Sequence, residues 1–260
     1  MTRLDIEDVS IRLADSFLGN RLRHLVSLES TNVTARQALE RGVDPPILVS
    51  TDFQTDGKGR RGRAWRAPRE SSLLMSLVVP LPPGSFAGDL VHASALAASS
   101  TIGDITGLST SIKWPNDVLI NGRKSVGVLT ETAVVDDHMC AIVGTGINVN
   151  FDPASVQGLP SSATSVSAEL GAPISREDLL VAFIRSWERR YLRWIEDQDS
   201  LHEEWCAFLG TLRQWVTVYD DSGHWSGLAV GVERDGSLRV RDTTGRTRVV
   251  YAADVSIRAH

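Results

Sequence analysis

The sequence changes character near residue 210, and this change constrains the fold more than any other feature. Up to that point, stretches with helical periodicity alternate with β-rich runs. From Gln214 onward the chain reads only as short strands, with turn signals at Ser222-Gly223, Asp235-Gly236 and Thr244-Gly245. Such a switch is typical of a mixed domain followed by an all-β unit. We therefore expect a mixed domain over residues 1–210 and a small β-barrel domain over residues 211–260.

The dipeptide Asn121-Gly122 is the strongest local signal in the first part of the chain. It separates two β-type runs, and both residues tolerate the positive φ of a type I′ turn, so it predicts a tight hairpin. Composition and alternation predict further strands over residues 22–30, 45–54, 71–80 and 139–150. Helical periodicity, with a capping box at Ser175 and Asp178, predicts helices over residues 30–42, 87–105, 175–198 and 200–210.

Size and charge exclude several classes of protein. A chain of 260 residues with 42% hydrophobic side chains is long enough to bury a sizeable core. It contains no run of about 18 apolar residues and no apolar stretch of a secretory signal, so we expect no membrane association and a cytoplasmic location. A net charge of −5 argues against general affinity for nucleic acid, which needs a broad basic face.

Cysteine and histidine usage gives no sign of a dedicated metal site. The two cysteines, Cys140 and Cys206, are far apart, and the six histidines are scattered without an HExxH motif. We expect both cysteines to be small apolar side chains in a reducing compartment.

The segment QTDGKGRRGRAW, from Gln54 to Trp65, places four cations among three glycines. Cations that repel one another on a flexible backbone cost stability unless an anion binds between them. Glycine amides can approach a phosphate or carboxylate, and arginine can hydrogen-bond it in a bidentate manner. The segment therefore predicts an anion-binding loop that orders on its ligand, with a solvated basic turn as the alternative.

Two common nucleotide-binding fingerprints do not fit this loop. Residues 57–62 satisfy GxGxxG, but Pro68 stands where the dinucleotide fingerprint requires a helix. A P-loop requires Lys and then Ser or Thr after its last glycine, whereas Gly62 is followed by Arg63 and Ala64. The loop is therefore expected to join strands.

Four ordered segments resemble the motifs of one family. They are STN at 30–32, QTDGKGRRGRAW at 54–65, KWPNDVLINGRKSVGVLTE at 113–131 and GTGINVN at 144–150. From these motifs the chain is identified as a member of the biotin protein ligase, or biotin–[acetyl-CoA-carboxylase] ligase, family over residues 22–258. The resemblance implies an α+β fold in which helices flank a mixed β-sheet, as in class II aminoacyl-tRNA synthetases, with a C-terminal SH3-like barrel. Because only 21 residues precede Leu22, we expect the monofunctional type without an N-terminal DNA-binding domain.

The resemblance also implies a reaction and its participants. Biotin's carboxylate attacks the α-phosphate of ATP to give biotinoyl-5′-AMP, and a lysine of a biotin carboxyl carrier protein then displaces AMP. The mixed anhydride is labile in water, so the site must cover it. ATP and biotin are the expected substrates, with Mg²⁺ accompanying ATP. We expect a monomer or weak homodimer, and the general base for the acceptor lysine is left open between Asp117 and solvent.

The same resemblance assigns roles to individual residues. Arg60 near the α-phosphate and Lys124 at the biotin carboxylate are the catalytic candidates, because neutralising both groups lets two anions approach. Gly127 is expected to leave room for the biotin rings. The expected biotin-binding residues are Ser30, Thr31, Asn32, Gln54, Gly57, Lys58, Gly59, Arg60, Lys124 and Gly127. The residues expected to bind ATP or the adenylate are Arg60, Arg63, Trp65, Lys113, Asn116, Asp117 and Asn148, and Asp117 is the expected Mg²⁺ ligand.

Simpler interpretations stay open for several of these residues. Ser30 and Thr31 can cap the following helix, Trp65 can belong to the core, and Lys124 can be a solvated cation at a strand start. Lys58 stands where the family usually has arginine and lacks its bidentate fork. Two other functions compete, namely a lipoate or octanoyl transferase and a biotin-responsive repressor.

Overall fold

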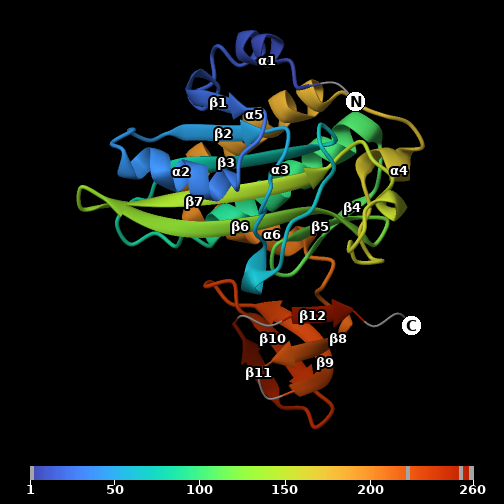
Figure 1. Ribbon diagram of the computed structural model, residues 1–260. Helices are drawn as coiled ribbons and strands as arrows, with labels where there is room; N and C mark the ends of the chain where they lie inside the picture. Colours follow the sequence, from blue (N-terminus) through green and yellow to red (C-terminus); the bar gives the residue numbers. More distant parts are fainter. Residues whose placement is uncertain (1–2, 221–222, 252–253, 258–260) are drawn as a thin grey trace.

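The computed structural model describes residues 3–220, 223–251 and 254–257. Its elements form a large seven-stranded sheet with helices and a separate five-stranded sheet, drawn one below the other in Figure 1. In the described part of the chain, no helix is both long and apolar enough to cross a membrane. The expected α+β class, with a mixed sheet and a C-terminal SH3-like unit, is confirmed.

The large sheet has the strand order β1-β2-β3-β7-β6-β5-β4. Only β1 and β2 run parallel; every other neighbouring pair is antiparallel. The strands are β1 (Leu22–Leu25), β2 (Ile47–Thr51), β3 (Ser72–Pro80), β4 (Thr110–Lys113), β5 (Asp117–Ile120), β6 (Arg123–Val135) and β7 (His138–Asn148). The long central strands β3, β6 and β7 provide the floor on which the candidate site is built.

Helices cover both faces of this sheet. Along β3, Leu77 packs into the cluster that contains α3, whereas its neighbour Val78 packs into the cluster that contains α2, because successive strand residues point to opposite faces. Further out, α5 and α6 pack against α3 (Figure 1). The helices are α1 (Ile6–Arg12), α2 (Thr31–Glu40), α3 (Asp89–Thr106), α4 (Val166–Leu170), α5 (Arg176–Glu196) and α6 (Gln198–Phe208).

The C-terminal sheet is antiparallel throughout, in the order β11-β10-β9-β8-β12. Its strands are β8 (Trp215–Asp220), β9 (Gly223–Val232), β10 (Leu238–Asp242), β11 (Thr247–Val250) and β12 (Asp254–Ile257). The turns at Gly236 and Gly245 are confirmed, with φ of 77° and 87°, while Ser222 lies outside the described residues. The boundary at residue 210 stays a proposal, supported by the end of α6 at Phe208 and the start of β8 at Trp215.

The turn between β9 and β10 packs against α3 and the segment after β4. The Arg234 guanidinium donates to both carboxylate oxygens of the buried Asp89, at 2.9 and 3.1 Å. The Trp114 indole donates to the carbonyl of Gly236 at 2.8 Å. The small sheet is thereby attached to the segment that begins the KWPND motif.

Local predictions agree with the structure, apart from details at element ends. Asn121 and Gly122 have φ of 49° and 80°, as the type I′ hairpin requires. The predicted strand over 22–30 ends at Leu25. At the start of α5, the Ser175 hydroxyl accepts from the Asp178 amide, but the Asp178 carboxylate pairs with Arg12 at 2.9 Å instead of closing the capping box.

Candidate active site

A cavity of about 290 Å³ opens over the middle of the large sheet and brings the four motif segments together. Every residue of the two predicted binding sets lines it except Gly57. Its described lining includes a single carboxylate, Asp117, and six cations, which are Lys58, Arg60, Arg63, Arg66, Lys113 and Lys124. In a chain of net charge −5, this local excess of positive charge favours an anionic ligand.

The connection between β2 and β3 spans residues 52–71, and its residues 53–71 are here called the basic loop. It forms no α-helix after its glycines and only one 3₁₀ turn, Arg60–Gly62, which agrees with the rejection of a dinucleotide fingerprint. The Gly59 amide donates to the Arg63 carbonyl and the Trp65 amide to the Gly57 carbonyl, both at 2.7 Å. The loop therefore folds back on itself as a short hairpin above the cavity.

Gly57 does not line the cavity, but it allows the two halves of this hairpin to pack closely. A Cβ atom at this position would lie 2.5 Å from the Trp65 carbonyl oxygen and 2.8 Å from Gln54 Nε2. Glycine is therefore required for the close approach of the two halves of the loop, and its expected contact with biotin stays a prediction.

Arg60 connects the basic loop to the KWPND segment. Its guanidinium donates to the Asn116 side-chain oxygen at 3.2 Å, and the Asn116 amide in turn donates to the Val128 carbonyl of β6 at 2.6 Å. Asn116 therefore orients Arg60 over the sheet. This contact places one candidate catalytic cation at the cavity wall.

Lys124 lies at the start of β6 with its ammonium in the cavity. Its Nζ atom is 2.6 Å from Asp117 Oδ1 and 5.6 Å from the centre of the Trp65 ring. The Lys124 ammonium thus lies between a carboxylate and an aromatic face, both of which attract it. A substrate carboxylate that binds Lys124 has to share this ammonium with Asp117.

The backbone of Lys124 is fixed from the side. Its amide donates to the Ser162 carbonyl and its carbonyl accepts from the Thr164 amide, both at 2.7 Å. Glu169 holds this segment, because its carboxylate accepts from the Thr164 hydroxyl at 2.6 Å and pairs with Arg123 at 2.7 Å. Burial works to raise the pKa of Glu169, but hydrogen bonds from Thr164, Asn121 and Arg123 outweigh it and hold the pKa below its usual range.

Trp65 rests on two glycines of the central strands. A Cβ atom at Gly127 would lie 2.6 Å from the Trp65 ring, and one at Gly146 would lie 2.5 Å from it. The indole therefore packs against Gly127, which also lines the cavity, and the expected contact of Gly127 with the biotin rings stays a prediction. Because the ring also lines the cavity, Trp65 combines packing with a surface on which a planar ligand can stack.

The N-terminus of α2 forms the polar end of the cavity. The Thr31 amide and hydroxyl both donate to Gln54 Oε1, at 2.8 and 3.2 Å. The Asn32 side chain accepts from the Ser76 hydroxyl at 2.6 Å and donates to Glu131 at 2.9 Å. Asn32 reaches this position because Gly144 has no side chain, since a Cβ there would lie 2.3 Å from Asn32 Oδ1.

Ser30 is the N-cap residue of α2 by position, as the cap interpretation expects, but no hydrogen bond joins its side chain to the helix. Ser30 also lines the cavity. Thr31 is the first residue of the helix.

Asn148, at the end of β7, has one uncommitted atom. Its amide nitrogen donates to the Thr164 carbonyl at 2.9 Å, while Oδ1 is buried without a hydrogen-bond partner. A buried acceptor without a partner is costly unless a ligand supplies the donor. Its place in the cavity lining fits a contact with a hydroxyl or amide of a bound ligand.

The residues of the site fit a Mg²⁺ ion that binds together with a nucleotide and is held mainly by its phosphates. The described chain contains no cluster of three or more His, Cys, Asp or Glu side chains arranged for a metal. Asp117 is the one carboxylate of the described lining, which matches a hard cation bound by few protein groups and by phosphates.

Several lining residues escaped the sequence analysis. Arg66 lines the cavity and donates to the Gln157 carbonyl at 3.3 Å. The connection after β7 also closes one side, through Leu159, Pro160, Ser162 and Ala163. Its Gly, Pro and Ser content predicts only a loop, and no sequence signal shows that it returns to Lys124.

Comparison with known proteins identifies the family. Residues 25–148 match the model of the biotin/lipoate A/B protein ligase family. The chain is 31% identical over 262 aligned residues to the bifunctional ligase/repressor BirA of Bacillus subtilis, covering 98% of this chain and 79% of that protein. It is 31% identical over 235 residues to the biotin–[acetyl-CoA-carboxylase] ligase of Mycobacterium tuberculosis, covering 87% of this chain and 85% of that one.

The fold agrees with these relatives. A biotin protein ligase from Aquifex aeolicus, solved in complex with biotin and ATP, superposes with a TM-score of 0.75 at 24% identity, over 92% of this chain and 99% of that one. The chain is thus a ligase of the biotin/lipoate class. Within that class it belongs to the biotin protein ligase family.

Proposed function

We propose that this chain is an ATP-dependent biotin ligase that forms biotinoyl-5′-AMP in the cavity and transfers biotin to a lysine of a biotin carboxyl carrier protein. One observation carries this proposal: six cations and a single carboxylate line the described cavity of an acidic protein. Both partners of the first step, a carboxylate and a triphosphate, are anions that repel each other. A cationic lining lowers that barrier.

Lys124 and Arg60 act in the first step. The Lys124 ammonium binds the biotin carboxylate and the bridging oxygen of the α-phosphate, taking over part of the interaction that Asp117 makes with it. Arg60, oriented by Asn116, stabilises the additional negative charge on the α-phosphate in the transition state. Lys113 and Arg63 line the cavity and neutralise the departing pyrophosphate.

The other lining residues bind and orient the substrates. Ser30, Thr31, Asn32 and Gln54 supply the polar end for the ureido ring of biotin, and Trp65 supplies an aromatic face for the adenine. Mg²⁺ arriving with ATP would be held on the protein side by Asp117 and would neutralise phosphate charge. The basic loop excludes water from the anhydride until the acceptor lysine arrives.

The proposal extends to partners and location. Net charge and the confined positive cavity favour a protein that acts on small anions and a carrier domain rather than on nucleic acid. A monomer or weak homodimer is sufficient, because all the proposed site residues come from one chain. Both described cysteines are free thiols, which fits a cytoplasmic enzyme.

The test is a transfer assay with purified protein. The chain, Mg²⁺, ATP and a biotin carboxyl carrier domain are incubated with biotin, lipoate or octanoate, and the carrier is analysed by mass spectrometry. Addition of biotin to one lysine, without addition of the other acids, is the expected result. Preferential transfer of lipoate or octanoate would contradict the substrate, and no transfer of any acid would contradict the reaction.

A further inference from the structure

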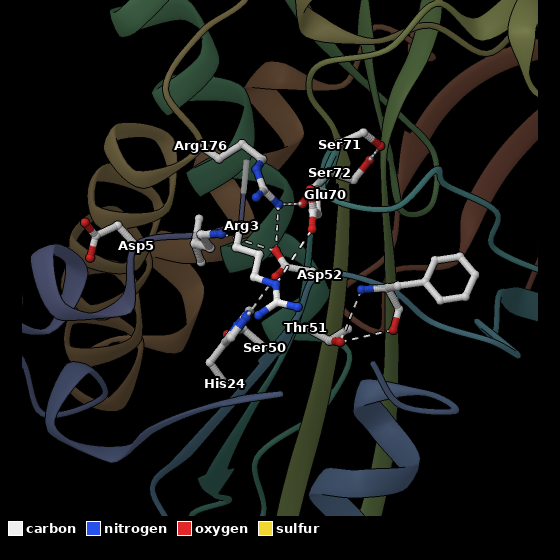
Figure 2. A network of polar contacts seen from close by, with 12 residues as sticks. Arg3, Asp5, His24, Ser50, Thr51, Asp52, Glu70, Ser71, Ser72 and Arg176 are labelled. Atoms are coloured by element: carbon white, nitrogen blue, oxygen red, sulfur yellow. Dashed lines mark hydrogen bonds and ion pairs between the residues drawn. The ribbon is translucent and has the colours of Figure 1, made fainter. Parts of the chain in front are cut away.

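A second polar network lies at the base of the basic loop, outside the cavity lining (Figure 2). Its centre is a contact between Asp52 and Arg176, with side chains only 2% and 4% exposed. Two such buried charges are rare unless paired. A buried ion pair is weak grounds for stability, because well-packed apolar side chains of similar volume serve a core as well or better. We therefore look for the role of this ion pair in the position of the segments that it joins.

Arg176 reaches both ends of the basic loop. It is the first residue of α5, and its Nη1 atom donates to Asp52 Oδ1 and to the Ser72 carbonyl, both at 3.1 Å (Figure 2). Asp52 directly precedes the loop, and Ser72 directly follows it as the first residue of β3. One guanidinium thus joins the residue before the basic loop to the residue after it.

Asp52 adds further contacts at the same point. Its carboxylate is 3.3 Å from His24 Nε2 of β1 and accepts from the Leu4 amide at 3.4 Å. Its backbone carbonyl accepts from the Glu70 amide near the end of the loop at 3.0 Å. The base of the loop is therefore fixed to β1, to the N-terminal segment and to α5.

The residues just beyond this base are those of the proposed site. Gln54 lies two positions after Asp52 and accepts from Thr31, and Arg60 and Trp65 follow on the same loop. Loop residues hold catalytic geometry only as precisely as the ends of the loop are held. A displacement of about 1 Å at a reacting group can cost a hundredfold in rate.

We propose that Arg176 is a positioning residue for adenylation, which joins the two ends of the basic loop through Asp52 and Ser72 and so keeps the loop closed over the adenylate. It touches no substrate and acts through the loop. The inference rests on the proposed function for its effect on the adenylate, whereas its effect on the loop itself is independent of any reaction.

The test compares two double variants, each of which changes one residue of α5 and its partner. Asp52→Asn/Arg176→Met removes both buried charges together, so that neither remains unpaired. Arg190→Met/Glu204→Gln is the matched control, because this partly buried pair joins α5 to α6 at 2.9 Å away from the cavity. Each variant is measured for unfolding in urea, for native-state trypsin cleavage after Lys58, Arg60, Arg61 and Arg63, and for dissociation of bound biotinoyl-5′-AMP.

The proposal expects cleavage within the loop and release of the adenylate to accelerate at least about tenfold in the first variant. In the control variant, the rates of loop cleavage and of adenylate release should stay unchanged, even if its free energy of unfolding falls as much as that of the first variant. Unchanged loop cleavage and adenylate release in the first variant would overturn the proposal, as would equal acceleration in the control. If the first variant does not fold, Arg176→Lys is measured in its place, and the same results for loop cleavage and adenylate release support or overturn the proposal. If the wild-type protein makes no adenylate, the proposed function fails while loop cleavage still decides the role of Arg176.

Discussion

Replacing Gly146 by alanine tests the contact between the sheet floor and Trp65. Gly146 is the third residue from the end of β7 and has no positive φ, so alanine suits its backbone. The new Cβ would lie 2.5, 2.7 and 2.8 Å from three atoms of the indole. Because an ordinary contact needs about 3.5 Å, the ring has to move by about 1 Å.

The magnitude follows from the ways in which this clash can be relieved. Forcing an extra methyl group into a packed site costs about 1 to 3 kcal/mol. If the strand and the ring stay in place, this cost appears in the free energy of unfolding. If the indole moves instead, the adenine surface is misplaced, and kcat/KM for ATP in adenylation falls by about 10- to 100-fold.

The assay measures urea unfolding and the rate of biotinoyl-5′-AMP formation for wild type and Gly146→Ala. Gly103→Ala in α3 is the control, because its nearest neighbouring atom would be 3.7 Å away, and alanine is favoured over glycine in a helix by about 1 kcal/mol. A Gly146→Ala protein with wild-type stability and wild-type adenylation would refute the placement of Trp65 on this strand.

Three further predictions concern charged groups. Lys58→Ala should change the free energy of unfolding by less than about 0.5 kcal/mol in a urea titration, because the Lys58 side chain is exposed and its ion pair with Glu29 at 3.7 Å is exposed as well. A larger loss would contradict this. Burial lowers the pKa of His92 to about 3, so the folded protein excludes a proton that the unfolded chain binds below pH 6.5. The free energy of unfolding should therefore fall as pH drops below 6.5, by about 2 kcal/mol at pH 5. His92→Gln should show no such loss. Because the pKa of Glu169 is lowered in the fold, its ionised carboxylate stabilises the protein above the unfolded pKa of about 4.3, and this stabilisation is lost as pH falls through the folded pKa. Glu169→Gln should therefore destabilise the protein at pH 7 and by less at pH 4. An equal loss of stability at both pH values would refute this role of the Glu169 carboxylate.

The local elements were predictable where short-range chemistry decides them. Asn121 and Gly122 specify their turn by backbone preference alone, and the structure has the expected hairpin between β5 and β6. The change near residue 210 reflects a change in hydrophobic period, which the sequence displays directly. The end of β1 at Leu25 was not predictable, because residues 26–30 carry the same β-type composition as the strand itself.

The site was predictable as a set of motifs but not as a set of contacts. The motif resemblance selects residues that all line one cavity except Gly57. It says nothing of the contacts between these residues, such as the packing of Trp65 against Gly127. Likewise, the pairing of Lys124 with Asp117 and the orientation of Arg60 by Asn116 depend on tertiary geometry.

The long-range supports were absent from the sequence analysis for the same reason. Arg176 and Asp52 are 124 positions apart, and each alone reads as an ordinary charged residue. Glu169 reads as one acid in a short helix, although it holds the segment that pairs with Lys124. Such roles become visible only when the chain is folded.

In the proposed reaction, Lys124 and Arg60 join biotin to AMP in the cavity. The most direct measurement incubates the purified chain with biotin, Mg²⁺ and ATP labelled at the α-phosphate, without acceptor, and quantifies protein-bound biotinoyl-5′-AMP. Wild type should accumulate the adenylate, Lys124→Ala should form little, and Arg60→Gly should release it faster. No adenylate in the wild type would contradict the proposed reaction, and equal formation and retention in all three proteins would contradict the roles of Lys124 and Arg60.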